Sequence, residues 1–104
     1  MIKIENTNGP EQCRNMDDIR AEIDLIDERI IQAIAERFKY VKAAAKFKKS
    51  ETSVKAPERF KTMLFQRRIW AQESGLNPET IEKIFSDLVK YFIKEEMKRW
   101  QKEN

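Results

Sequence analysis

Hydrophobic residues recur along segment 19–44 in steps that alternate between four and three, which is the spacing of one face of an α-helix. The segment contains neither glycine nor proline. A second segment, 81–92, repeats the spacing, and no part of the sequence alternates apolar and polar residues with a period of two. The pattern therefore predicts an all-α protein. The apolar positions are Ile19, Ile23, Ile26, Ile30, Ala33, Val41 and Ala44, and then Ile81, Phe85, Leu88 and Phe92.

The first helix is expected to cover residues 17–49, with Asp17 or Asp18 as its cap and residues 1–16 as an N-terminal extension. Such a helix is about 45 Å long, whereas a compact domain of this size has a radius of gyration of about 13 Å. A single chain offers too little surface to cover an apolar stripe of that length. We therefore expect one domain, residues 1–104, that forms an intertwined helical homodimer through its first helix.

Two prolines and a glycine divide the rest of the chain. Pro57 suits the first turn of a second helix over residues 57–74, and Gly75 is suited to end it. Asn77 is expected to cap a third helix over residues 78–101, and Pro78 suits its first turn. A polar stretch before Pro57 is expected to be a connector. Three helices are predicted, the first much longer than the others.

Charged side chains occupy positions on the apolar faces where the spacing calls for hydrophobic residues. Arg37 and Lys48 continue the stripe of the first helix, and Arg20 lies at its edge. Glu96 follows the apolar positions of the third helix on the same face. These charges invite a structural interpretation and a functional one.

In the structural interpretation, a polar core residue fixes the register of the helices, long cationic side chains reach the surface, or Arg37 pairs with Glu96. In the functional interpretation, the helices enclose a cationic pocket for a small dicarboxylate, because guanidinium groups bind carboxylates in a bidentate manner. An unpaired buried charge costs several kcal/mol. Three cations directed at one interior therefore favour the pocket.

The composition narrows the possible chemistry. The sequence contains no histidine and a single cysteine, Cys13, which excludes imidazole bases, internal disulfides and thiolate clusters. The 21 basic and 18 acidic residues are interspersed and leave a net charge of +3, which weighs against a nucleic-acid partner. No run approaches a membrane span, and the start lacks the apolar core of a signal peptide. We expect a cytoplasmic protein with no membrane partner.

The stretch DIRAEIDLIDERIIQAIAERFKYVKAAAKFK, residues 18–48, resembles the first helix of the all-helical chorismate mutase family. The family pattern there is an arginine near the start, an interior arginine and a lysine eleven residues later. The motifs APERFKTML, WAQESGL and FIKEEMKRW make the chain more similar to the isochorismate pyruvate lyases of salicylate biosynthesis, which belong to the same structural class. The resemblance covers about residues 10–100 without an obvious gap.

The resemblance implies roles for four residues. Arg20 would reach into the site of the other subunit and bind one substrate carboxylate, and Arg37 would hold the second. Lys48 would contact the ether oxygen and a carboxylate. Glu96 stands where the bacterial lyases carry a glutamine that is hydrogen-bonded to the ether region. Lys48 and Glu96 are therefore the expected catalytic residues, within a substrate-binding set of all four.

The implied reaction is the cleavage of isochorismate to salicylate and pyruvate by a pericyclic elimination that needs neither cofactor nor metal. A weaker chorismate mutase activity is implied as well. The mutases usually carry an Arg-Glu pair at the start of the second helix, where this chain has Arg59 and Phe60, and phenylalanine cannot accept a hydrogen bond from chorismate. A dedicated chorismate mutase remains an alternative. A non-catalytic helical dimer that acts as an interaction module is the alternative from another class.

Overall fold

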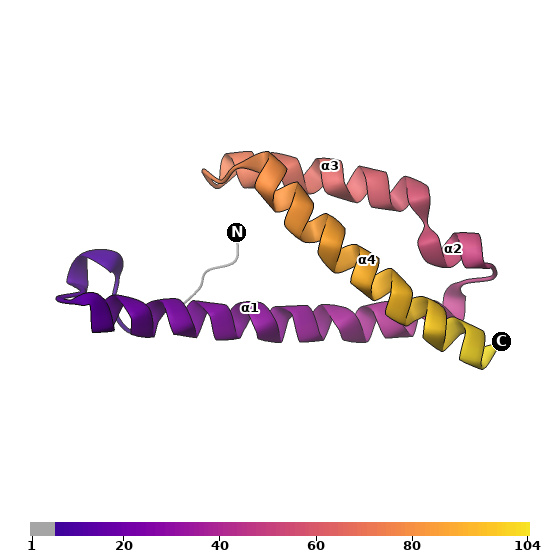
Figure 1. Ribbon diagram of the computed structural model, residues 1–104, viewed down its shortest axis with the longest axis horizontal. Helices are drawn as coiled ribbons and strands as arrows, with labels where there is room; N and C mark the ends of the chain where they lie inside the picture. The colour runs from indigo at the N-terminus through magenta and orange to yellow at the C-terminus, as the bar shows by residue number, and fades with distance from the viewer. Residues whose placement is uncertain (1–5) are drawn as a thin grey trace. The chain divides into compact units, whose positions relative to one another are not determined.

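The computed structural model describes residues 6–104, which contain helices and turns but no strand (Figure 1). The prediction of an all-α protein is confirmed for these residues. Residues 1–5 of the expected N-terminal extension lie outside the described residues. In chain order the elements are the 3-10 helix η1 (Pro10–Gln12), α1 (Met16–Ala44), the 3-10 helix η2 (Ala45–Phe47), α2 (Glu51–Lys55), α3 (Pro57–Glu73) and α4 (Pro78–Glu103).

The contacts divide the chain into two compact units, Met1–Phe38 and Lys39–Asn104. The single domain over residues 1–104 stays a prediction.

The first unit contains the start of α1, and its cap differs from the expected one. The side chain of Asn15 accepts a hydrogen bond from the backbone N–H of Asp18, at 2.9 Å. The carboxylate of Asp18 in turn accepts from the backbone N–H of Arg14, at 3.0 Å. The prediction that Asp17 or Asp18 caps the helix was therefore wrong. Both residues lie in the first turn, where their negative charges interact favourably with the positive end of the helix dipole.

The N-terminal segment of the same unit is fastened to α1 by one buried carboxylate. Glu22 accepts hydrogen bonds from the Asn6 side chain at 3.0 Å and from the Asn8 backbone at 2.7 Å. These bonds lower the pKa of Glu22, the Asn6 bond most, and burial opposes them in part. A carboxylate beside the apolar residues Ile19 and Ile26 is thus enclosed by the extension instead of by solvent.

In the second unit α1 ends earlier than expected, at Ala44 instead of residue 49. The chain tightens into η2 and then becomes extended at Lys48, whose φ and ψ are −87° and 135°. The expected connector contains the short helix α2, whose cap is the Ser50 side chain, accepting from the Ser53 backbone N–H at 3.1 Å. A helix of five residues is too short to produce an apolar repeat, which explains why the spacing did not reveal it.

The other two helices lie close to their expected bounds. α3 ends in a turn in which Leu76 N–H bonds to Ala71 O at 2.8 Å and Gly75 N–H to Gln72 O at 3.2 Å. Gly75 has a φ of +76°, a left-handed conformation that glycine adopts without strain and that completes this helix-ending motif. Asn77 then caps α4, its side chain accepting from the backbone N–H of Thr80 at 2.9 Å.

α4 is the central element of the second unit, packing against α3, α2 and η2 (Figure 1). Its apolar face holds Phe92 in the core, as the spacing predicted. Among residues 6–104, no helix is long and apolar enough to cross a membrane. The buried hydrophobic side chains of the unit are Ala45, Val54, Met63, Ala71 and Phe92.

Candidate active site

Lys48 and Glu96 come together in the second unit, although they are 48 positions apart in the sequence. The Lys48 Nζ lies 3.7 Å from Glu96 Oε2. The Glu96 side chain is 7% exposed and the Lys48 side chain 25% exposed. A nearly buried carboxyl group therefore faces an ammonium group that still reaches solvent.

Three elements position Lys48. Its backbone N–H donates to Ala45 O at 3.2 Å, which closes the last turn of η2. Its Nζ donates to the backbone carbonyl of Ser53 in α2, at 2.9 Å. Its own carbonyl accepts a hydrogen bond from the indole N–H of Trp100 in α4, also at 2.9 Å. Both ends of the residue are thus held.

Glu96 occupies the position on the apolar face of α4 at which the spacing placed it. Burial raises the pKa of this carboxyl above its ordinary value of 4.5, and the nearby Lys48 ammonium opposes part of the rise. Its Oε2 atom is buried and accepts no hydrogen bond among the described residues. The Lys48 ammonium lies at ion-pair distance instead, so the oxygen is able to bind a proton or face a ligand.

This pair combines two functions useful to a reaction that develops negative charge. A fixed ammonium group stabilises a developing oxyanion, and a carboxyl group with a raised pKa donates a hydrogen bond in its protonated form. Among residues 6–104, no three acidic or cysteine side chains gather closely enough to hold a metal ion.

The two predicted arginines lie in the first unit, both on α1. Arg20 is exposed and Arg37 is half-buried. Their grouping with Lys48 and Glu96 stays a prediction.

Sequence reasoning missed the residues that hold Lys48. The Ser53 carbonyl is a backbone atom, which no side-chain pattern reveals. Trp100 did leave a signal, because it lies four residues after Glu96 and so shares its helix face.

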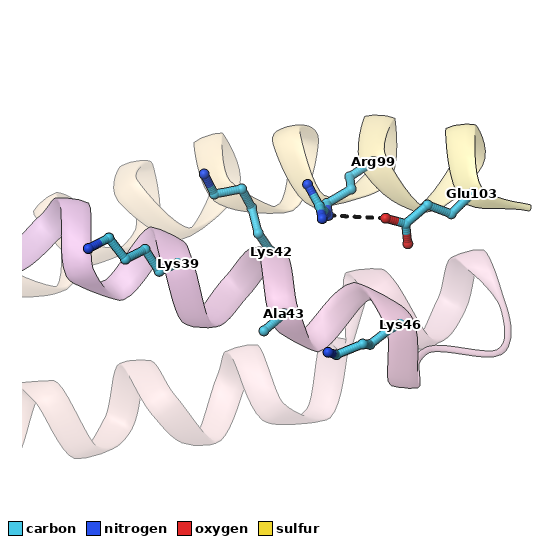
Figure 2. Close-up of a pocket in the computed structure, with 6 residues that line it drawn as sticks. All are labelled: Lys39, Lys42, Ala43, Lys46, Arg99 and Glu103. Carbon is cyan, nitrogen blue, oxygen red and sulfur yellow. Dashed lines mark ion pairs between the residues drawn. The ribbon is translucent and has the colours of Figure 1, made fainter.

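A second cationic feature lies beside the end of α1. Lys39, Lys42 and Lys46 line a groove of about 340 Å³ together with Arg99 and Glu103 of α4 (Figure 2). Arg99 Nε lies 3.2 Å from Glu103 Oε1, so Arg99 forms an ion pair within the groove. Lysines near the last turn of a helix are stabilised by its dipole, which accounts for the charge without a ligand. Neither Lys48 nor Glu96 lines this groove.

Comparison with known protein families tests the resemblance. Residues 19–97 match the family described as chorismate mutase type II. That match covers more than half of the chain and contains all four predicted site residues. The chain belongs to the chorismate mutase type II family. The family assignment made from the sequence motifs is confirmed.

Two relatives of this chorismate mutase type II chain differ in size. The isochorismate pyruvate lyase of Pseudomonas aeruginosa is 45% identical over 92 residues, a match that spans 88% of this chain and 91% of the relative. The T-protein of Haemophilus influenzae is 35% identical over 79 residues, which span 75% of this chain but 20% of that longer protein. The chain therefore matches the lyase along almost the whole length of both proteins.

Proposed function

We propose that this protein is an isochorismate pyruvate lyase, which cleaves isochorismate to salicylate and pyruvate. The observation that carries the proposal is the 45% identity to the Pseudomonas aeruginosa lyase over 91% of that protein. The Lys48–Glu96 pair supports it, because its groups suit a reaction that breaks a C–O bond and leaves charge on the ether oxygen.

In the proposed mechanism the ether bond breaks while a hydrogen moves from ring carbon C2 to the enolpyruvyl methylene. Both groups come from the substrate, so the protein supplies no nucleophile. Its residues hold the flexible dianion in the reactive conformation and stabilise the developing charge. Lys48 faces the ether oxygen with its ammonium group, and protonated Glu96 donates to the same region.

The two arginines complete the proposed site. Arg37 binds one carboxylate of the substrate, and Arg20 of a second subunit binds the other, so the active unit is a homodimer with shared sites. The exposed isoleucines of α1 support this assembly: Ile23 and Ile30 are 48% and 49% exposed, and such a stripe is typical of an interface.

A second candidate is a dedicated chorismate mutase, favoured by the family match over residues 19–97. Phe60 argues against it, because this half-buried side chain stands where the mutases usually carry a hydrogen-bond acceptor. A non-catalytic helical dimer that acts as an interaction module is the third hypothesis.

Assays of the purified protein with isochorismate and with chorismate, in parallel, separate the three. We expect salicylate and pyruvate from isochorismate, at a rate well above that of prephenate formation from chorismate. Faster turnover of chorismate would identify a mutase, and no turnover of either substrate would identify a non-catalytic protein.

The Lys48→Ala variant connects that activity to the site. We expect turnover of isochorismate to fall by about 10² or more, because a fixed charge at a developing oxyanion contributes on that scale. The control is Lys49→Ala, which removes the same charge from the exposed neighbouring position. Circular dichroism should show the same helix content for both variants. Equal lyase activity in the two variants would contradict the assignment of Lys48.

A further inference from the structure

The end of α4 holds Lys48 at two points that are one helical turn apart. Glu96 faces the side chain of Lys48, with 3.7 Å between Oε2 and Nζ. Four residues later, Trp100 donates its indole N–H to the backbone carbonyl of Lys48, at 2.9 Å. Residues four apart share one face of a helix, so a single surface of α4 contacts both the charged end and the backbone of this residue.

The backbone at Lys48 needs such a contact. Lys48 lies between η2 and α2 in extended conformation, so its carbonyl belongs to no helix. A half-buried carbonyl that loses its donor costs free energy comparable to a lost hydrogen bond. Lysine also has a long side chain with many rotamers, and the position of its ammonium group depends on where the backbone is fixed.

We propose that Trp100 is a positioning residue for Lys48, acting through the hydrogen bond between its indole N–H and the Lys48 carbonyl. This inference rests on the proposed function, in which Lys48 stabilises the ether oxygen. Trp100 lies beyond residues 19–97, the part of the chain that matches the family. A neighbouring bond, from Gln101 Nε2 to Glu51 Oε1 at 3.4 Å, joins α4 to α2 without touching Lys48 and so provides a natural control.

The test replaces the N–H of Trp100 while keeping the shape of its side chain. In benzothienylalanine a sulfur atom takes the place of the indole N–H, so the ring system still packs but no longer donates. The chain contains two tryptophans, Trp70 and Trp100. Incorporating the analogue into a Trp70→Phe background places it at position 100 alone, and the Trp70→Phe protein with ordinary tryptophan is the reference.

We expect kcat for isochorismate to fall about threefold to tenfold, which is the range of one lost hydrogen bond, with a smaller change in KM. The melting temperature should stay within a few degrees of the reference. The second readout does not depend on activity: the backbone 15N order parameter of Lys48 should decrease in the analogue-bearing protein. Gln101→Ala, in the natural protein, should leave kcat and this order parameter unchanged.

The outcomes separate the two proposals. A natural protein that does not cleave isochorismate would contradict the proposed function, and the order parameter would then decide alone whether Trp100 fixes Lys48. An active reference whose kcat and order parameter both survive the analogue would overturn the role of Trp100. A loss in Trp100→Phe that the analogue restores would also overturn it, because packing of the ring and not the N–H would then be responsible.

Discussion

Glu96 has a carboxyl group, whereas the resemblance to the bacterial lyases implies a glutamine amide at this position. An amide donates a hydrogen bond at every pH, whereas a carboxyl group donates only when it is protonated. The structure places this side chain within the core of the second unit, 7% exposed, and burial raises its pKa above 4.5. The fraction of protonated Glu96 therefore depends on pH over a range above that value.

The Glu96→Gln variant should change the pH dependence of the lyase. If Glu96 donates to the ether oxygen, wild-type turnover rises as pH falls through the raised pKa of Glu96. The variant carries a permanent donor, so its profile should be flat in that range, with equal or higher activity at neutral pH. The measurement is kcat against pH for both proteins, with Glu95→Gln as the control on the same helix. Identical profiles for wild type and Glu96→Gln would mean that Glu96 does not donate in the reaction.

The raised pKa of Glu96 should also make the folding stability of the protein depend on pH. Because the pKa of Glu96 is higher in the folded protein than the ordinary 4.5, the folded state keeps its proton when the unfolded state has lost it. The stabilising contribution of protonated Glu96 is complete below about pH 4.5 and is lost as pH rises through the folded pKa. Glu96→Gln should lack this loss, so its stability relative to wild type increases over that interval.

The resemblance implied that Lys48 and Glu96 share a site, and the structure brings the two side chains together, but their surroundings were not predicted. The four-and-three spacing placed Glu96 on the apolar face of α4, and the structure shows it buried there. The bonds that hold Lys48 depend on the extended backbone at that residue and on a carbonyl in α2. Neither leaves a periodic trace in the sequence, because both arise from the path of the chain after η2.

At the scale of elements, capping residues explain both what was predicted and what was missed. Pro78 and Gly75 marked the turn between α3 and α4, and the structure confirms Asn77 as the predicted cap of α4. Ser50 caps the five-residue helix α2, which is too short for its apolar pattern to be recognised. Proline, glycine and capping residues at the ends of long helices are thus recognisable in the sequence. A helix of one or two turns is not, because its stability depends on packing against neighbouring elements.

Two cap substitutions should have different consequences. Asn77→Ala removes the bond to Thr80 N–H and should lower the free energy of unfolding by about 1 kcal/mol without changing kcat. Ser50→Ala removes the bond to Ser53 N–H, and the carbonyl of Ser53 is the acceptor for Lys48 Nζ. It should therefore lower kcat as well as stability. Urea unfolding measures the change in stability, and steady-state kinetics measure kcat. If kcat is the same in Ser50→Ala as in Asn77→Ala, α2 does not position Lys48 for catalysis.

At the scale of the whole molecule, the exposed stripe of α1 is the feature that a single chain leaves unexplained. Ile19, Ile23 and Ile30 are each more than a third exposed. Their spacing predicted a partner helix, and in the proposed homodimer a second copy of the chain would supply one with the same stripe. The proposed exchange of Arg20 between subunits therefore belongs to this scale, because it depends on how two copies of the chain assemble.

Mixing two inactive variants determines which subunit supplies Arg20. Arg20→Ala and Lys48→Ala should each abolish most lyase activity alone. Random mixing makes about half of the dimers mixed, and a shared site leaves one intact site in each, so about a quarter of wild-type turnover should return. A mixture of Arg37→Ala and Lys48→Ala should stay inactive, because both residues belong to the same subunit's part of the site.

Sedimentation must first show a dimer at micromolar concentration, and a monodisperse monomer would contradict the assembly. Mixed dimers of Arg20→Ala and Lys48→Ala that form but remain inactive would show that Arg20 serves the site of its own subunit.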